Sequence, residues 1–290
     1  MFLWLLTFYQ TGPNGLFIFY QVFNLILQSA NETFLIPIRQ NNDLSDVALN
    51  ELRMDLDEHP LNQRKYTELA YLPGNSRKYS LNSVKTIESP LRHKKILFLG
   101  SSVTFGFGAL GESFVDYLWK KDGIDAIKDA ENGTTLVDQD TSYHGDSYVA
   151  RFKEELKEDK PDMLVLQLST NDANTNQKLG KISSDDTFDT QTIIGSIEYI
   201  INEAHKKWDC PILIYTNPYF ESNLYEQMVD STLELAKKWG VQVLDLYHNS
   251  EFKKQDSLYM ADEIHPTRAG YLEKWMPLFE EQLNNLLLKK

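Results

Sequence analysis

The sequence predicts an α/β protein in which a parallel sheet lies between two layers of helices. Three observations support this prediction. From residue 94 onward, short apolar runs alternate with stretches of helical periodicity, glycine or proline marks several junctions, and hydrophobic residues make up 42% of the chain, as in ordinary globular proteins. Strands that alternate with helices indicate a parallel sheet covered on both faces, and right-handed crossovers make it a doubly wound, three-layer α/β/α sandwich.

Five apolar runs have the length expected of buried strands. They are Ile96–Leu99, Ile124–Lys128, Met163–Leu168, Ile212–Thr216 and Val241–Leu246. Pro161 and Pro211 stand just before the third and fourth runs, where a missing N–H costs little. The first run is closed by Gly100, which predicts a tight turn directly after the strand.

Stretches with helical character separate and follow these runs. They are Phe114–Lys121, Tyr148–Glu158, Thr190–Trp208, Leu224–Trp239 and Thr267–Leu287. In the fourth stretch, Leu224, Met228, Leu235 and Trp239 recur at helical intervals, and Gly240 is suited to end the helix. The alternation of five strands with five helices therefore accounts for residues 94–290 as one main domain.

Residues 1–30 are strongly apolar and form a segment of their own. The segment holds two apolar runs, and each is shorter than the roughly 20 residues that a membrane-spanning helix needs. No Lys or Arg precedes Arg39, so neither a signal peptide nor a membrane orientation is indicated. We expect an arm packed on the domain, with weak membrane association and self-association as the alternatives, because apolar patches of this size usually have a partner.

Residues 31–93 predict an extension or linker between the apolar segment and the main domain. Over 31–60, polar and acidic residues indicate a loop with one short helix near Val47–Met54. Over 65–90, three tyrosines and a turn at Pro73-Gly-Asn75 indicate a linker or a small β-like extension.

Charge and cysteine content exclude several classes of function. The formal net charge of −13 argues against nucleic acid as a partner, because such a partner needs Lys and Arg to displace counterions. The only cysteine, Cys210, cannot form an internal disulfide, and we interpret it as a buried structural thiol. One cysteine and no recognisable signal peptide favour a cytoplasmic location, with membrane association through residues 1–30 as the alternative.

The sequence indicates no metal or organic cofactor. No group of His, Cys and carboxylate residues has the spacing of metal ligands. The pair Gly106-x-Gly108 lacks the rest of a dinucleotide-binding fingerprint.

Polar residues follow the predicted strands at the carboxyl edge, where open α/β sheets bind ligands. The segments concerned are Ser101-Ser102, Asn132-Gly133-Thr134, Ser169-Thr-Asn171-Asp172, Asn217-Pro-Tyr219 and Asp262-Glu-Ile-His265-Pro266. A hydroxyl, a glycine N–H, a carboxamide, an imidazole and a carboxylate are therefore expected to meet on one rim.

These groups are typical of nucleophilic catalysis. A serine hydroxyl needs an adjacent base, and the His265 imidazole titrates near neutral pH. Asp262, three residues earlier, can fix the imidazole tautomer and stabilise the imidazolium. An oxyanion needs hydrogen-bond donors, and the candidates are the backbone N–H groups of Ser102 and Gly133 and the side-chain amide of Asn171.

Over roughly residues 94–288 the chain resembles the SGNH hydrolases, also called GDSL esterases/lipases. The matching pieces are Gly100-Ser-Ser-Val-Thr104, Gly133 in Glu-Asn-Gly-Thr-Thr, Asn171-Asp172 and Asp262-x-x-His265-Pro266. The resemblance implies a five-stranded parallel sheet of flavodoxin-like order, with Ser102, His265 and Asp262 as the triad and Gly133 and Asn171 as oxyanion donors. Ser101 and Ser169 depart from the family's usual Asp and Gly, but the register with Gly100 and Thr104 favours Ser102 as nucleophile.

We therefore expect a metal-independent serine esterase that acts through an acyl-enzyme. Its substrate is expected to be a small-molecule or carbohydrate ester with a short acyl group, such as an acetyl ester. Tyr143, His144 and Tyr219 stand on loops near the site and are candidate substrate contacts. Two alternatives remain open: an O-acyltransferase that uses the same triad, and a non-catalytic binding protein on this scaffold.

Overall fold

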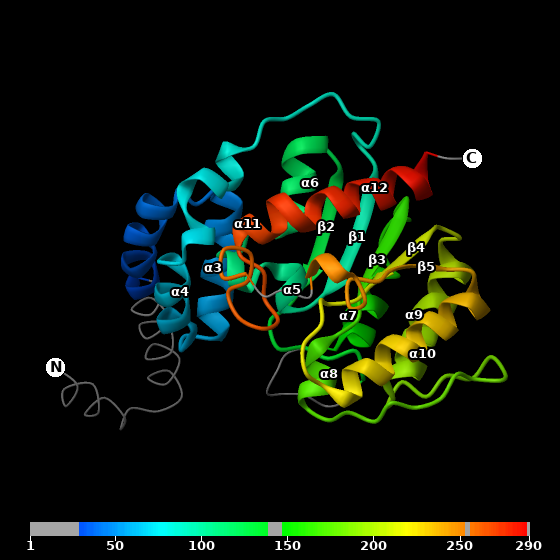
Figure 1. Ribbon diagram of the computed structural model, residues 1–290. Helices are drawn as coiled ribbons and strands as arrows, with labels where there is room; N and C mark the ends of the chain where they lie inside the picture. Colours follow the sequence, from blue (N-terminus) through cyan, green and yellow to red (C-terminus); the bar gives the residue numbers. More distant parts are fainter. Residues whose placement is uncertain (1–28, 139–146, 253–255, 289–290) are drawn as a thin grey trace, which may run out of the picture.

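The computed structural model describes residues 29–138, 147–252 and 256–288 (Figure 1). Most of the apolar segment and two of the candidate substrate contacts, Tyr143 and His144, lie outside the described residues.

Five strands form a single sheet in which every pairing is parallel. They are β1 (Lys95–Gly100), β2 (Asp125–Ala130), β3 (Met163–Gln167), β4 (Ile212–Tyr215) and β5 (Gln242–Leu244). Their order in the sheet is β2-β1-β3-β4-β5, which is the flavodoxin-like order. The predicted fold class is confirmed, and each predicted strand lies within two residues of an observed one at both ends.

Helices cover both faces of this sheet (Figure 1). On one face lie α7 (Tyr148–Glu155), α9 (Ile193–Lys207) and α10 (Asn223–Trp239). On the other lie α6 (Phe114–Asp122) and α12 (Met276–Leu287). Within β1, alternate residues enter opposite layers: Leu97 and Leu99 pack under α7 and α9, whereas Ile96 and Phe98 pack under α6 and α12.

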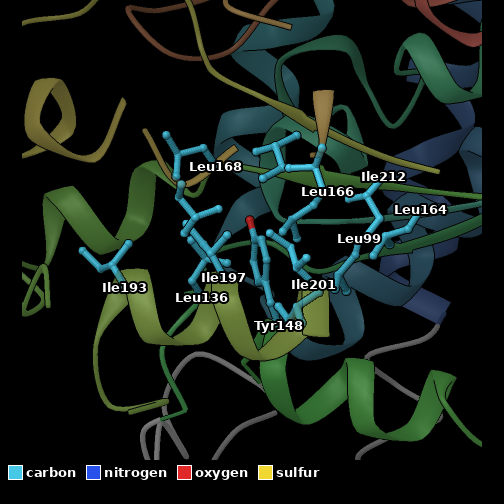
Figure 2. Packing of buried hydrophobic residues seen from close by; sticks show 14 of the residues in the cluster. Leu99, Leu136, Tyr148, Leu164, Leu166, Leu168, Ile193, Ile197, Ile201 and Ile212 are labelled. Carbon is cyan, nitrogen blue, oxygen red and sulfur yellow. The ribbon is translucent and has the colours of Figure 1, made fainter. Parts of the chain in front are cut away.

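The layer under α7 and α9 is a continuous hydrophobic core. Figure 2 shows Leu99, Leu164 and Leu166 from the strands against Tyr148 of α7 and Ile197 of α9. All five residues are at most 1% exposed. This packing fixes the carboxyl ends of β1 and β3 beside each other, and the candidate site residues follow these ends.

The last predicted helix is interrupted. It consists of α11 (Arg268–Gly270), a π-helical turn over Tyr271–Trp275, and α12. Pro277, in the first turn of α12, has no N–H for a bond to the preceding turn. The widened turn lies where that regular hydrogen bond is lost.

Residues 31–93 differ from the prediction. Residues 29–42 are helical and are followed by α3 (Asp46–Glu58) and α4 (Asn62–Ala70). Three short 3₁₀ turns come next: Pro73–Asn75, Arg77–Tyr79 and Leu81–Ser83. The short helix expected near Val47–Met54 is confirmed, since it lies within α3. The loop expected over the rest of 31–60 is wrong, and so is the β-like character expected over 65–90, because every regular element described between 29 and 93 is helical.

The helical spacing of the leucines in α3 is obscured by the acidic residues around them. Leu49, Leu52 and Leu56 recur at helical intervals and are buried, whereas Asp57 and Glu58 are exposed. Ser45 accepts a hydrogen bond from the Ala48 N–H and caps the helix. Because most of these acidic residues occupy the solvent face, their number does not indicate a loop.

This helical extension packs against the main domain, at the end of the sandwich near α5 (Ser102–Phe105) and α11 (Figure 1). Leu52, Tyr66 and Leu69 of the extension form a core with Leu110, and Phe107 packs against it. No helix among the described residues has the length and apolar character needed to cross a membrane.

Candidate active site

Ser102 begins the short helix α5 (Ser102–Phe105), directly after the turn that closes β1. That turn requires Gly100, because a Cβ at this position would lie 1.8 Å from Thr104 Oγ1. Ser102 is 7% exposed, so it is largely buried at the carboxyl edge of the sheet. The strand-to-helix turn therefore presents a serine where the sequence predicted one.

The three residues predicted as a triad are in hydrogen-bond contact. Ser102 Oγ lies 2.8 Å from His265 Nε2, and His265 Nδ1 lies 2.8 Å from Asp262 Oδ2. The backbone N–H groups of Ile264 and His265 both donate to Asp262 Oδ1, at 2.8 and 2.7 Å. Nδ1 carries the proton shared with the carboxylate, which leaves Nε2 as the acceptor for the Ser102 hydroxyl.

The electrostatics of Asp262 suit this arrangement. Burial alone would raise the pKa of Asp262, but the hydrogen bonds and charge of His265 outweigh it and hold the pKa at about 2. The carboxylate is therefore ionised at neutral pH, where it can stabilise an imidazolium on His265.

Ser101 and Ser102 have different surroundings. Ser101 is fully buried, and its Oγ accepts from Gln167 Nε2 at 3.3 Å. Gln167 Oε1 in turn accepts from the N–H of Ser101 at 2.9 Å and from both the N–H and the hydroxyl of Thr104. The side chain of Ser101 thus faces the sheet and only that of Ser102 faces His265.

Gln167 holds the turn, and the sequence analysis missed it. Its signal was available, because it is the one polar residue in the apolar run Met163–Leu168. A buried polar side chain in a central strand needs partners, and here the partners are the turn that carries the serine.

The two further candidate oxyanion donors stand on neighbouring segments. Gly133 adopts a left-handed backbone, with φ +81°. Asn171 Nδ2 donates to the carbonyl of Thr134 at 2.8 Å, which ties α8 (Thr170–Asn174) to the loop that carries Gly133. In the described part of the chain, the backbone N–H groups of Ser102 and Gly133 have no hydrogen-bond acceptor.

Asp172 also binds the loop that carries Gly133, at residues that follow the glycine. Its buried carboxylate accepts from the N–H groups of Leu136 and Val137, at 2.7 and 3.3 Å. Burial raises the pKa of Asp172 to about 6, although these hydrogen bonds act in the opposite direction. Ser169 caps α8 by accepting from the Asp172 N–H, which gives a structural reason for a serine where the family usually has glycine.

Asn217, which the sequence placed on the rim without a role, supports the histidine. Asn217 follows β4, is fully buried, and donates from Nδ2 to the carbonyl of Ile264 at 2.9 Å. It anchors the Asp262–His265 segment to the sheet. Its signal was its position in the loop after a predicted strand, where polar residues gather.

Tyr219, a predicted substrate contact, stands in the loop after β4, and its role stays a prediction. Its side chain is 48% exposed, and its ring packs against Tyr247 with centroids 5.4 Å apart. Nearby, His248 and Asp245 form a second Asp-x-x-His pair at 2.8 Å, but no contact joins that pair to Ser102. The geometry therefore selects His265 as the serine's partner.

The fold and the match to a family model together define the class, an enzyme that hydrolyses ester bonds. Residues 98–272, more than half of the chain, match the model of the GDSL-like lipase/acylhydrolase family. The chain belongs to this family, which confirms the resemblance to the SGNH hydrolases.

Solved structures with the same fold include several bacterial proteins. One from Lactobacillus plantarum has 19% identity and a TM-score of 0.53, covering 68% of this chain and 97% of that one. A Desulfitobacterium hafniense DCB-2 protein assigned to the lipolytic G-D-S-L family has 18% identity and a TM-score of 0.52, covering 65% and 99%. A Bacteroides ovatus ATCC 8483 protein described as a GDSL-like lipase has 15% identity and a TM-score of 0.51, covering 67% and 99%. No curated protein matches the sequence.

Proposed function

We propose that this protein is a serine esterase in which Ser102 is the nucleophile, His265 the general base and Asp262 the residue that orients it. The observation that carries the proposal is the continuous hydrogen-bond chain from Ser102 Oγ through the imidazole to Asp262, with 2.8 Å at both steps. A serine hydroxyl becomes a useful nucleophile only when such a base accepts its proton.

The reaction proceeds in two halves. Ser102 Oγ attacks the ester carbonyl carbon while its proton passes to His265 Nε2. The tetrahedral intermediate collapses, the bond to the alcohol oxygen breaks, and His265 returns the proton to the leaving alcohol. Water then attacks the acyl-enzyme with His265 again as the base, and the acid is released with Ser102 restored.

The oxyanion of both intermediates is stabilised by neutral donors. We assign this role to the backbone N–H groups of Ser102 and Gly133 and to the amide of Asn171. The open N–H groups and the link from Asn171 Nδ2 to Thr134 support the assignment. Loss of one such donor typically lowers kcat by about 10²–10³.

Short acyl groups on small or carbohydrate alcohols are the proposed substrates. A charged side chain stands beside the Gly133 loop: the guanidinium of Arg151 donates to Thr134 Oγ1. An apolar groove of about 810 Å³ lies on the N-terminal helices, and its lining includes neither Ser102 nor His265. It therefore gives a long acyl chain no chamber beside the nucleophile.

The test is hydrolysis of 4-nitrophenyl esters of increasing acyl length by the wild type and by Ser102→Ala and Ser101→Ala variants. We expect the highest kcat/KM for acetate, loss of activity in Ser102→Ala, and fluorophosphonate labelling of Ser101→Ala but not of Ser102→Ala. Equal labelling of the two variants would overturn the assignment of Ser102. Product analysis with an added sugar acceptor distinguishes hydrolysis from acyl transfer.

A further inference from the structure

Asn132 stands immediately before Gly133, and its side chain points away from the main domain's sheet towards the N-terminal extension. Asn132 Nδ2 donates to Asp55 Oδ1 of α3 at 2.5 Å. Both side chains are buried, with Asn132 9% and Asp55 6% exposed. A charge-assisted bond in such surroundings is among the stronger hydrogen bonds in proteins.

The Asp55 carboxylate is held firmly by its own part of the chain. Its Oδ2 accepts from the hydroxyl of Tyr66 at 2.6 Å and from Asn62 Nδ2 at 2.8 Å. His59 Nδ1 lies 3.2 Å from Oδ1. These three partners belong to the extension, so the carboxylate stays in place whether or not Asn132 contacts it.

The other side of the Gly133 loop is held by the main domain. The carbonyl of Thr134 accepts from Asn171, and its hydroxyl accepts from Arg151, which also donates to the carbonyl of Gly100 at 2.7 Å. Gly133 thus lies between two anchored residues, one tied to the extension and one tied to the main domain. Because glycine has wide conformational freedom, these two anchors set the direction of its N–H.

The extension also reaches the histidine side of the site. The ring of Tyr66 packs on Phe107, and Phe107 packs on the imidazole of His265, with 5.4 Å between centroids in each pair. Asn75 donates to the carbonyl of Gly108 at 2.8 Å and accepts from the N–H of Arg268 at 2.9 Å. The extension therefore contacts both halves of the site.

We propose that Asp55 is a positioning residue for ester hydrolysis, acting through Asn132 to fix the direction of the Gly133 N–H. This inference rests on the proposed function, in which that N–H binds the oxyanion. It makes the helical extension part of the active-site framework, although the family match begins only at residue 98.

Two variants of the full chain remove the hydrogen bond between Asn132 and Asp55, one by changing its donor and one by changing its acceptor. Asn132→Ala removes the donor and leaves Asp55 with its three partners in the extension. Asp55→Asn keeps the shape of the side chain but turns one acceptor into a donor that faces other donors. The matched control is Asp46→Asn on the same helix, where the exposed carboxylate pairs with Arg39.

The measurements are kcat and KM for 4-nitrophenyl acetate and the inhibition constant of a short trifluoromethyl ketone, whose hemiketal oxyanion mimics the intermediate. We expect both site variants to lower kcat by about tenfold to a hundredfold, less than outright loss of a donor. KM should change by less than about threefold, and the inhibitor should bind more weakly by the same factor as the fall in kcat.

The outcomes separate this inference from the proposed function. If Asn132→Ala folds with the wild-type melting temperature and keeps both kcat and inhibitor affinity, the positioning role of Asp55 is refuted while Ser102 remains the nucleophile. Retained activity in Ser102→Ala would instead overturn the proposed function itself. Equal losses in Asp46→Asn and Asp55→Asn would also refute the specific role of Asp55.

Discussion

Arg268 and Glu112 form an ion pair inside the protein, with Arg268 Nε 3.0 Å from Glu112 Oε2 and both side chains fully buried. Glu112 also accepts from the N–H groups of Ser45 and Leu81, which belong to the extension. Burial raises the pKa of Glu112, although the charge of Arg268 opposes this. The pair thus joins the helix that follows the histidine loop to the N-terminal helices.

Removing one charge of this pair should destabilise the fold strongly. In Glu112→Gln, Arg268 loses its buried counter-charge, and we expect the free energy of unfolding to fall by about 3–5 kcal/mol. Glu68→Gln is the control, because it removes a solvent-exposed pair with Arg64 and should cost less than about 1 kcal/mol. Urea denaturation followed by circular dichroism measures both, and similar losses would contradict the expectation.

Asp262→Asn should impair catalysis far more than stability. The amide cannot hold His265 in the tautomer whose Nε2 accepts the serine proton, and we expect kcat to fall by about 10⁴. Asp245→Asn is a close control, since Asp245 makes the same i, i+3 contact with His248 without touching Ser102. Steady-state kinetics on 4-nitrophenyl acetate should leave this control near wild type; a comparable loss there would argue against Asp262.

A methyl group at Gly100 should disable the site. Its Cβ would meet Thr104 Oγ1 at 1.8 Å and Gln167 Oε1 at 2.7 Å, so Gly100→Ala must displace the turn that carries Ser102. The control is Gly240→Ala, where nothing lies within 4 Å and only the positive φ of +67° opposes the side chain. We expect loss of fluorophosphonate labelling in the first variant and a cost of about 1 kcal/mol in the second.

Asp172 should make the protein more stable as the solution becomes mildly acidic. Its pKa is about 6 in the folded protein against an ordinary value of 3.8, so the folded state binds the proton more tightly. The contribution of this group to stability therefore rises as the pH falls from about 7 to 4, by up to about 1.4 kcal/mol per pH unit. Asp172→Asn should remove this rise in urea titrations at several pH values.

The pKa shift of Asp262 has the opposite effect on stability, and this effect occurs at lower pH. Its pKa is lowered to about 2, so the stability that it contributes is present above about pH 4 and is lost as the pH falls towards 2. The carboxyl groups of Asp172 and Asp262 thus titrate in separate pH ranges. The loss of stability that wild type shows below about pH 4 should therefore be absent from the Asp262→Asn variant.

The sheet was predictable because its signals are local. The central strands are apolar runs closed by turn residues, as Ile96–Leu99 is closed by Gly100. The candidate site was predictable for the same reason, because its residues follow the strands and parallel strands end on one edge. Ser102 could be preferred to Ser101 from the register of the motif alone.

Other features depend on contacts that periodicity does not reveal. The roles of Gln167 and Asn217 were not predicted because they are hydrogen bonds to segments distant in sequence, such as the turn at Ser101 and the carbonyl of Ile264. The extension was mistaken for a loop because the acidic face of α3 masks the spacing of its leucines. Asp55 looked like one acidic residue among many, and only its burial beside Asn132 distinguishes it.

The acid and base of the triad are neighbours in the chain, whereas the nucleophile is 163 residues away from the base. Asp262 and His265 are joined by a local turn, but Ser102 reaches His265 only when β1 and the last loop are docked together. Reactivity of Ser102 therefore reports whether β1 and the loop that carries His265 are docked together. As denaturant is added, ester hydrolysis should be lost before the helical signal. A separation of about one or two ångströms between these segments inactivates Ser102 while the helices remain folded.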